Sequence, residues 1–376
     1  MKRYLSEYII EDLKTKMVFL GGPRQVGKTT LANEFLNADS GSYLTWDSNS
    51  DRKKILNEEL PIAEGILVLD EIHKYSKWRN LIKGLYDKNK SKIKFLVTGS
   101  ARLDYYRRGG DSLQGRYHYY RLHPISLGEL INLNEKADLE SLFQYGGFPE
   151  PFLKANAKFC RRWQNERATK IIREDLRDLE RVNEISQIAI LADSLESKVG
   201  SPLSVQSLAT DLQVAHKTVK KWLEILSNLY FCFTIPPFGS PKIRAVKKEQ
   251  KLYLWDWSLC TDDGARFENL VACQLLKYCH FIEDTEGHKM ELRYIRDTDK
   301  REVDFVVIKD KKPEFAVECK LNDKNLSPHL NYFKERTTIN KFYQVYYKED
   351  KKNNSYLKNG IEVLAFEDFV RKLKLP

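Results

Sequence analysis

The sequence lacks long apolar runs, closely spaced cysteine pairs, internal repeats and low-complexity segments. No stretch approaches the roughly 18 uninterrupted apolar residues that favour a transmembrane helix. The N-terminal stretch MKRYLSEYIIEDLKTK carries acidic residues where a signal peptide needs a continuous apolar segment, which favours an amphipathic helix instead. The six cysteines have no CxxC spacing and lie mostly within apolar runs, as is typical of buried thiols in a reducing compartment. We therefore expect a cytoplasmic protein with no membrane association.

What the sequence does have is a globular composition with a basic charge balance. The chain has 376 residues, of which 42% are apolar and 31% charged, enough for two or three domains. Its net charge is +10, which is compatible with an anionic partner but does not identify one. Residues 151–260 hold 18 Lys and Arg against 12 Asp and Glu, and this excess is larger than that of either flanking segment.

The stretch MVFLGGPRQVGKTTLANEFL predicts a strand, a glycine-rich loop and a helix. Within it, GPRQVGKT fits the GxxxxGK[ST] pattern of a P-loop from Gly22 to Thr29. The glycines let backbone N–H groups curl around phosphates, Lys28 reaches the β- and γ-phosphates, and the Thr29 hydroxyl ligates Mg²⁺. The helix N-terminus adds its dipole. The predicted nucleotide-binding residues are Gly22, Pro23, Arg24, Gln25, Val26, Gly27, Lys28, Thr29 and Thr30.

A second nucleotide-binding signature, GILVLDEIHKYSKW, predicts a buried parallel strand that ends at Asp70 and Glu71. Asp70 at the end of a strand can hold the Mg²⁺ shell, and Glu71 can polarise the water that attacks the γ-phosphate. The alternative is a pair of acids that caps a following helix.

The segment IKFLVTGS predicts a third strand that ends beside the other two. Ser100, or with less support Thr98, is the candidate sensor of the γ-phosphate, and an ordinary polar loop residue is the alternative. Further on, LQGRYHYYRLHPISLGEL contains Arg116 and Arg121. Arg116 is the candidate finger that reaches a neighbouring subunit's nucleotide and stabilises transition-state charge, against the alternative of a surface arginine.

A family resemblance rests on five motifs in order: GPRQVGKTTL, ILVLDEIHKYSKW, FLVTGSARL, LQGRYHYYRLHPISLGEL and YGGFPEPFL. Together they resemble the AAA-type ATPase domain of a large archaeal and bacterial family. The first two are general to P-loop proteins, whereas GGFPE and LHPISLGEL are family-level features. The resemblance implies that a winged-helix region and a restriction-endonuclease-like region follow. One departure is Ala101 after TGS, where the family often has Ser or Asn, and it leaves Ser100 as the implied sensor.

The segment SPLSVQSLATDLQVAHKTVKKWLEIL predicts two helices joined by a turn. The second helix begins near His216 and has apolar residues at i, i+3, i+4 and i+7 from Val219. This is the layout of a helix-turn-helix whose second helix enters a major groove. The lysines on its opposite face, which we predict to contact DNA, are Lys217, Lys220 and Lys221.

The continuation YFCFTIPPFGSPKIRAVKKEQKLYLWD predicts two strands around a basic loop that includes Lys242 and Arg244, as a wing would. Lysine contacts mostly phosphates, so we expect sequence-independent DNA binding that salt weakens. The alternative is a helix-turn-helix that packs domains or binds proteins, with lysines that are only solvated.

The segment REVDFVVIKDKKPEFAVECK, residues 301–320, predicts two strands joined by a turn. Asp304 lies on an otherwise apolar strand face, where a carboxylate needs a charge partner or a metal ion. Asp304 and Glu318 are hard oxygen ligands suited to Mg²⁺, and Lys320 would orient the metal-bound water. Glu268, in the helical stretch ARFENLVACQLLKY, could complete the metal shell.

This order of helix Glu, strand Asp and strand ExK resembles the D…(D/E)xK pattern of the restriction-endonuclease-like fold. The elements FEN, REVDF and VECK also resemble the C-terminal part of the same ATPase family. Related folds often bind DNA or assemble without cutting, so the pattern leaves open whether this centre cleaves DNA or only grips it. The simpler alternatives are a charged hairpin and a helix-dipole contact for Glu268.

We therefore predict an α/β fold in three parts. These are an AAA-type P-loop ATPase domain with a parallel sheet flanked by helices at 1–160, a helical linker and winged helix at 161–255, and a restriction-endonuclease-like α/β domain at 256–376. The leading hypothesis is an ATP-hydrolysing homo-oligomer, a ring being one such assembly, that uses ATP and Mg²⁺ and contacts duplex or branched DNA. The hypothesis leaves open whether the protein also cleaves DNA with Mg²⁺. The competing hypothesis is an ATP-driven switch whose C-terminal domains bind protein partners without DNA.

Overall fold

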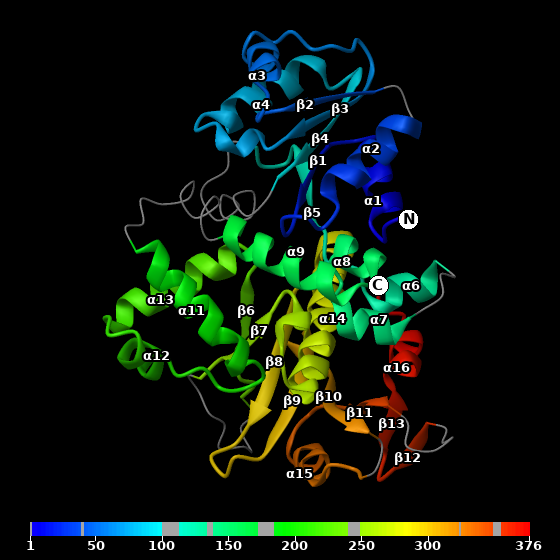
Figure 1. Ribbon diagram of the computed structural model, residues 1–376. Coiled ribbons are helices and arrows are strands. Elements are labelled where there is room, and N and C mark those ends of the chain that lie inside the picture. The colour runs from blue at the N-terminus through cyan, green and yellow to red at the C-terminus, as the bar shows by residue number, and fades with distance from the viewer. Residues whose placement is uncertain are drawn as a thin grey trace. The chain divides into compact units, whose positions relative to one another are not determined.

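The computed structural model describes residues 2–38, 41–99, 113–133, 138–171, 184–239, 249–322, 325–348 and 355–376 (Figure 1). These residues group into two compact units. The first runs to Pro124, and the second takes in nearly all described residues from Ile125 onward. The three-part division at 160 and 255 stays a prediction, because one compact unit can hold more than one functional segment.

A parallel five-stranded sheet forms the centre of the first unit. Its strands are β1 (Met17–Gly21), β2 (Gly41–Thr45), β3 (Gly65–Asp70), β4 (Ile93–Thr98) and β5 (Tyr117–Arg121). They lie in the order β2-β3-β4-β1-β5, and each neighbouring pair is parallel. β1 and β3 are buried along their whole length, as their continuous apolar runs predict for a sheet covered on both faces. The predicted parallel α/β sheet is confirmed.

Helices connect these strands and pack on the sheet. They are α1 (Ser6–Asp12), α2 (Lys28–Ala38), α3 (Asn49–Leu56), the 3-10 helix η1 (Ile72–Lys74) and α4 (Trp78–Asn89). α4 buries Trp78, Ile82 and Leu85, which share one helical face, in a cluster with Phe19 of β1. α2 packs against β2, β3 and β4. Since the P-loop joins β1 to α2, it lies at the edge where the parallel strands end, which is where open α/β sheets bind ligands.

A mixed six-stranded sheet forms the centre of the second unit. Its strands are β8 (Met290–Arg296), β9 (Glu302–Lys309), β10 (Lys312–Asn322), β11 (Lys341–Lys348), β12 (Tyr356–Lys358) and β13 (Ile361–Ala365). They lie in the order β12-β13-β11-β10-β9-β8. β11 is parallel to β10 and β13, and the other neighbouring pairs are antiparallel. The separate C-terminal α/β sheet that the sequence predicted is therefore present.

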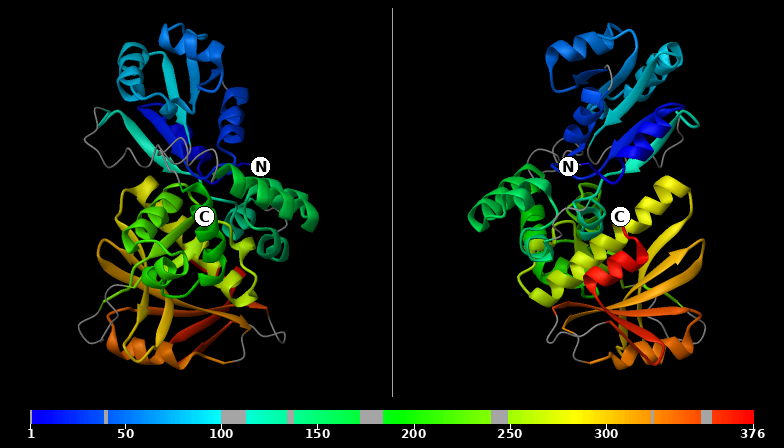
Figure 2. Two further views of the ribbon diagram at one scale, coloured as in Figure 1. Left: turned by 60° about the vertical axis from the view of Figure 1, so that its left-hand side comes forward. Right: turned by 90° about the vertical axis from the view of Figure 1, so that its right-hand side faces the viewer.

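The helices that cover this sheet are α14 (Asp263–Glu286), α15 (Pro328–Arg336) and α16 (Phe366–Leu373). Figure 2 shows α14 and α16 on one face of the sheet and α15 on the other. Phe315 of β10 contacts Phe369 of α16, whereas Ala316 packs in a cluster with Phe333 of α15. Successive residues of β10 therefore face opposite layers, and Glu318 shares its face with Ala316.

The second unit also contains a group of helices and one hairpin. They are α6 (Leu127–Asn132), α7 (Leu139–Tyr145), α8 (Pro149–Lys154), α9 (Ala157–Lys170), α11 (Ile185–Leu195), η4 (Glu196–Lys198), α12 (Val205–Asp211), α13 (His216–Asn228), β6 (Cys232–Ile235), β7 (Lys251–Leu254) and η5 (Trp257–Leu259). The turn between α12 and α13 passes through Gln213, whose φ is 54°. α13 buries Val219 and Trp222, and β6 and β7 pair antiparallel. These elements occur where periodicity predicts them, and their assignment as a winged helix stays a prediction.

None of the helices that the structure describes is long and apolar enough to cross a membrane. All six cysteines lie in the described part of the chain as thiols, and five of them are buried. Burial raises the pKa of the Cys232 thiol to about 12, which keeps it protonated and unreactive at neutral pH.

Candidate functional site

The P-loop has a backbone that only glycine adopts easily at two of its positions. Gly22 and Gly27 have φ of 142° and 99°, and Gln25 between them has φ of 64°. A Cβ atom at Gly22 would lie 2.4 Å from the carbonyl oxygen of Leu122, so no other residue fits there without a shift of the backbone. The loop passes close to the end of β5 and keeps the open backbone that phosphate binding requires.

Lys28, the first residue of α2, lies across this loop and is 8% exposed. Its Nζ donates to the carbonyl oxygens of Gly22 at 2.9 Å and Pro23 at 2.7 Å. These acceptors are neutral, and a phosphate oxygen is a stronger partner for an ammonium group. The ammonium group is therefore held at the loop by contacts that a nucleotide can replace.

Asp70, the last residue of β3, lies beside Thr29. Thr29 Oγ1 is 3.4 Å from Asp70 Oδ2, so the structure brings the two predicted Mg²⁺ ligands together. The hydroxyls of Tyr43 and Thr98 also donate to this carboxylate. Burial, and then the hydrogen bond to Asp70, raise the pKa of Tyr43. Tyr43 was missed from sequence, and Thr98, which was considered there only as a sensor, supports Asp70.

Glu71 follows Asp70 in a left-handed conformation, with φ of 56°. Its side chain makes no capping hydrogen bond to η1, so the capping alternative does not describe it. His73 Nε2 lies 3.5 Å and Lys74 Nζ 3.6 Å from its carboxylate. Burial raises the pKa of Glu71, against the opposing effect of Lys28 and Lys74. A raised pKa suits a carboxylate that has to accept a proton from water.

Arg3 supports the P-loop from outside the predicted motifs. Its Nη1 donates to the carbonyl oxygen of Val26 at 2.8 Å, and its Nη2 to that of His123 at 2.6 Å. The side chain is 7% exposed, so these bonds are shielded from water. In the sequence, Arg3 stands in the charged N-terminal stretch and carries no local signal of this contact. It ties the loop to the residue that follows β5.

Arg116 lies at the sheet edge opposite the P-loop. Its backbone carbonyl accepts a bond from the N–H of Met17, where β1 begins, whereas the loop follows the end of β1. The length of this strand separates the two by roughly 15 Å. Arg116 Nε and Nη2 bind Asp87 of α4 at 3.0 and 3.1 Å. This arginine therefore does not reach the nucleotide of its own chain, and its action on a neighbouring chain stays a prediction.

Three of the five predicted DNA contacts lie in the described part of the chain. Lys217, Lys220 and Lys221 are exposed on α13, opposite its buried stripe. Three further predicted residues lie outside the described part of the chain: Ser100, Lys242 and Arg244.

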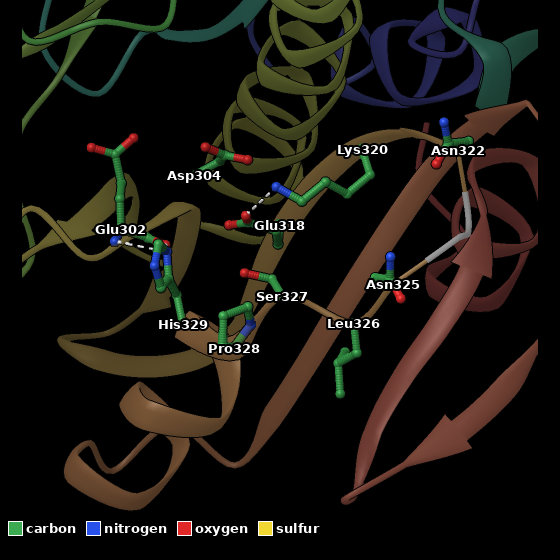
Figure 3. Close-up of a pocket in the computed structure, with 10 residues that line it drawn as sticks. All are labelled: Glu302, Asp304, Glu318, Lys320, Asn322, Asn325, Leu326, Ser327, Pro328 and His329. Carbon is green, nitrogen blue, oxygen red and sulfur yellow. Dashed lines mark hydrogen bonds and ion pairs between the residues drawn. The ribbon is translucent and has the colours of Figure 1, made fainter.

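The second site is a cavity of about 620 Å³ lined by β9, β10 and the start of α15 (Figure 3). The strand register, with Val317 opposite Phe305, places Glu318 opposite Asp304. As whole residues, Glu318 and Asp304 are 5% and 9% exposed. Lys320 Nζ lies 2.7 Å from Glu318 Oε1. The structure therefore brings together the Asp, Glu and Lys that the sequence pattern singled out.

Lys251, the first residue of β7, adds a cation to this centre that the sequence did not predict. Its side chain is fully buried. The Nζ lies 3.1 Å from Glu268 Oε1, 2.5 Å from Glu302 Oε1 and 3.3 Å from Asp304 Oδ1. The Tyr253 hydroxyl donates to the same oxygen of Glu268 at 2.7 Å. Three carboxylates from α14 and β9 thus converge on one ammonium group.

The carboxylates of this centre lie close together and are largely shielded from water, so the charge of one changes the pKa of the next. Burial, and then the nearby Asp304, raise the pKa of Glu318 to about 8, although Lys320 opposes the shift. Burial and Asp304 likewise raise the pKa of Glu268 to about 7, against Lys251 and Tyr253. Burial alone would lower the pKa of Lys251, but its carboxylate partners outweigh burial and raise it. Lys251 is therefore charged at neutral pH.

The predicted Mg²⁺ shell of Asp304, Glu318 and Glu268 can be tested against these contacts. Among the described residues, no group of three or more His, Cys, Asp or Glu side chains is arranged to hold a metal ion. Glu268 Oε1 and Asp304 Oδ1 face Lys251, and Asp304 Oδ2 accepts the N–H of Cys319 at 2.8 Å. Glu318 Oε2 is buried without a hydrogen-bond partner among the described residues. The residues present do not fit the predicted metal shell, because two of its three members are turned toward an internal cation.

Three family models match successive segments of the chain. The model described as AAA domain covers residues 14–131. Models described as Domain of unknown function (DUF8612) and Domain of unknown function (DUF4143) cover residues 136–262 and 263–369. Together with the P-loop geometry, the first match supports a P-loop ATPase of the AAA type in the N-terminal unit.

The chain is also similar to three curated proteins. Uncharacterized proteins of Mycobacterium bovis and Mycobacterium tuberculosis are each 24% identical to it over 250 residues, 65% of this chain and 55% of theirs. The chain therefore spans just over half the length of these mycobacterial relatives. An uncharacterized protein of Methanocaldococcus jannaschii is 24% identical over 389 aligned positions, 86% of this chain and 79% of its own.

One solved structure, a single-substitution variant of RuvB from Thermotoga maritima, is 16% identical to this chain. The match covers 61% of this chain and 87% of that one, with a TM-score of 0.33. A similarity at this level carries no argument about function.

Proposed function

We propose that this protein binds and hydrolyses ATP with Mg²⁺ and uses the nucleotide cycle to act on bound DNA. The observation that carries the ATPase part is the convergence of Lys28, Thr29, Asp70 and Glu71 at one edge of the parallel sheet. These side chains come from three different segments, α2, β3 and the turn after β3, so their proximity is a product of the fold.

Each residue has a defined part in the proposed reaction. The loop N–H groups and the start of α2 bind the phosphates, and Lys28 exchanges its two carbonyl partners for phosphate oxygens. Thr29 and Asp70 would hold Mg²⁺, which neutralises charge on the β- and γ-phosphates when bound. Glu71 orients the attacking water and accepts its proton.

A Lys28→Ala variant tests the ATPase proposal. We expect ATP affinity to fall about 10- to 100-fold, because a charge-assisted contact to phosphate is lost, and hydrolysis to fall with it. Nucleotide binding is measured by titration calorimetry and hydrolysis by phosphate release. Lys92→Ala is the matched control, since this lysine is exposed and precedes β4 at the opposite edge of the sheet. Unchanged hydrolysis by Lys28→Ala would show that the P-loop assignment is wrong.

The DNA part of the proposal rests on the basic face of α13. Lys217, Lys220 and Lys221 are exposed together, and residues 151–260 carry the largest basic excess of the chain. Lysines at this spacing contact phosphates rather than base edges, so binding is independent of sequence and weakened by salt. Mg²⁺-dependent DNA cleavage is not part of the proposal, because Glu268 and Asp304 of the predicted metal shell contact Lys251.

Charge reversal of the three α13 lysines to Glu tests DNA contact. We expect the logarithm of the DNA affinity to fall less steeply with the logarithm of salt concentration, by about 2 to 3 in slope, because phosphate contacts are removed. Lys300, Lys311 and Lys312 are exposed outside α13, and their reversal to Glu is the control with the same change in net charge. Duplex, single-stranded and branched DNA are compared. No binding by the unaltered protein at low salt would favour the alternative, an ATP-driven switch that binds protein partners.

We also place the protein in the cytoplasm, where its thiols stay reduced, and propose that it assembles with further copies of itself. The support for assembly comes from Arg116, which is partly exposed and lies away from the nucleotide site of the same chain. If Arg116 completes a neighbour's site, Arg116→Ala lowers the ATPase rate per chain only at concentrations where the protein is assembled.

A further inference from the structure

Lys251 enters the carboxylate centre from outside the six-stranded sheet. It belongs to β7, whose four residues are all buried. Two hydrogen bonds between Leu254 and Asn269 fix β7 on α14. The N–H of Leu254 donates to Asn269 Oδ1 at 2.8 Å, and Asn269 Nδ2 donates back to the carbonyl oxygen of Leu254 at 2.7 Å. This reciprocal amide pairing sets the position of Lys251 along α14.

The ammonium group of Lys251 uses its full donor capacity. An ammonium group has three N–H donors, and Lys251 has three carboxylate oxygens within 3.3 Å, from Glu268, Glu302 and Asp304. The second oxygen of Glu302 lies 2.6 Å from Arg296 Nη1. A buried charge is tolerated only when it is paired and hydrogen-bonded. Lys251 meets this condition through its three carboxylate partners, and Glu302 is paired with Arg296 as well.

A divalent cation at the same carboxylates would meet the charge of Lys251 at close range. Like charges at this separation in a buried site repel strongly, since the low local dielectric does not screen them. The ammonium group occupies the position between the carboxylates, and β7, which carries it, is fixed by Asn269. The ammonium group therefore cannot leave without unpacking β7.

We propose that Lys251 is an internal counter-ion that takes the place of a divalent metal ion in this centre. The carboxylates then hold the β6–β7 hairpin, and the helices before it, on the sheet. Removal of Lys251 turns the centre into a metal site, because the three partners of Lys251 and the nearby Glu318 are left without enough positive charge. This inference does not depend on DNA binding by α13 or on ATP hydrolysis.

The experiment measures Mn²⁺ binding by electron paramagnetic resonance with the nucleotide-free full chain. All proteins carry Thr29→Ala, which removes a metal ligand from the P-loop. We expect no Mn²⁺ bound at the centre with Lys251 present, and roughly one Mn²⁺ per chain in the Lys251→Met variant, because carboxylates are hard ligands for this ion. Adding Asp304→Asn to Lys251→Met should abolish the gain.

Lys277→Met is the matched control. Lys277 is also buried and ion-paired, with Glu129 Oε2 at 2.8 Å, but it lies on α14 more than two helical turns beyond Glu268. It should not gain Mn²⁺. A similar gain in Lys277→Met would show that any loosened buried carboxylate recruits the ion.

A comparison that keeps Lys251 tests the inference even if Lys251→Met does not fold. Here Asp304→Asn alone is compared with the parent chain. If the parent binds Mn²⁺ and Asp304→Asn does not, a metal ion coexists with Lys251 and the inference is overturned. If neither binds Mn²⁺ at this centre, the internal counter-ion is supported.

Discussion

The nucleotide site and the carboxylate centre use a buried lysine in opposite ways. Lys28 is bonded to two neutral backbone carbonyls, which a phosphate group can displace. Lys251 is bonded to three carboxylates and has no exposed surface. In a site for an exchangeable ligand, the lysine is bonded to neutral groups that the ligand can displace. In a structural centre, the lysine is bonded to charged groups that stay in place. The same residue type therefore indicates binding in one unit and stability in the other.

The largest difference between the two lysines should be in stability. Lys251→Met leaves three partly buried carboxylates without their buried cation, and breaking a buried ion pair costs about 3–5 kcal/mol. Lys28→Met removes two bonds to neutral carbonyls and the attraction to Glu71, and it should change the free energy of unfolding by about 1 kcal/mol. Urea unfolding of both variants measures this. Equal losses in the two would remove the distinction drawn between the sites.

The next effect concerns Glu71 in the nucleotide site. Glu71→Gln keeps the shape of the side chain but cannot accept a proton, so hydrolysis should fall about 100-fold or more while ATP still binds. Single-turnover hydrolysis and nucleotide titration separate the two properties. Glu64→Gln, at an exposed position before β3, is the control. A parallel loss of ATP binding would assign Glu71 a structural role instead.

A pH effect should distinguish the carboxylate centre. The pKa of Glu318 is about 8 in the folded protein against 4.5 for an ordinary Glu, so the folded state holds the proton more tightly between these values. The free energy of unfolding of the wild type should therefore fall as pH rises from 5 to 8.5, relative to Glu318→Gln. We expect a relative change on the order of 1–3 kcal/mol.

Urea unfolding at several pH values, with a chelator present, measures the Glu318 effect. Glu314→Gln provides the comparison, since this residue lies on the same strand and is only half-buried. A constant difference between wild type and Glu318→Gln across this range would show that Glu318 is ionised throughout.

The smallest effect is expected at Arg3, which braces the P-loop. Arg3→Ala removes two shielded bonds to backbone carbonyls and should cost the N-terminal unit about 1–2 kcal/mol and weaken ATP binding several-fold. Lys2→Ala is the matched control, because Lys2 pairs with exposed Glu7 and surface pairs contribute little. If both variants behave like the wild type, the brace has no energetic role.

Local patterns were sufficient for the nucleotide site. Lys28 and Thr29 lie in one contiguous motif, and Asp70 ends a strand whose apolar run identifies it as buried and parallel. Because the parallel strands of one sheet end at the same edge, the residues that follow β1 and those that end β3 can meet there, although β4 lies between the two strands. Local spacing likewise singled out Asp304, Glu318 and Lys320, whereas the register that places Glu318 opposite Asp304 was seen only in the structure.

Partners from distant segments were not predictable in this way. Tyr43 and Arg3 reach Asp70 and the P-loop from elements with no motif of their own. Lys251 is 53 residues from Asp304 in the chain. Its one local signal is a charged residue at the start of a strand whose other residues are apolar, which predicts that a partner exists but not which one.

The sequence by itself determined the parallel ATPase sheet, its phosphate-binding loop and the strand pair that carries Asp304, Glu318 and Lys320. These follow from spacing within short segments, where backbone geometry dictates which side chains are neighbours. Only the tertiary structure decided what neutralises the carboxylates. That outcome depends on how β7 packs against α14 and β9, and the resulting contact of Lys251 with Glu268 and Asp304 is not encoded in any local spacing.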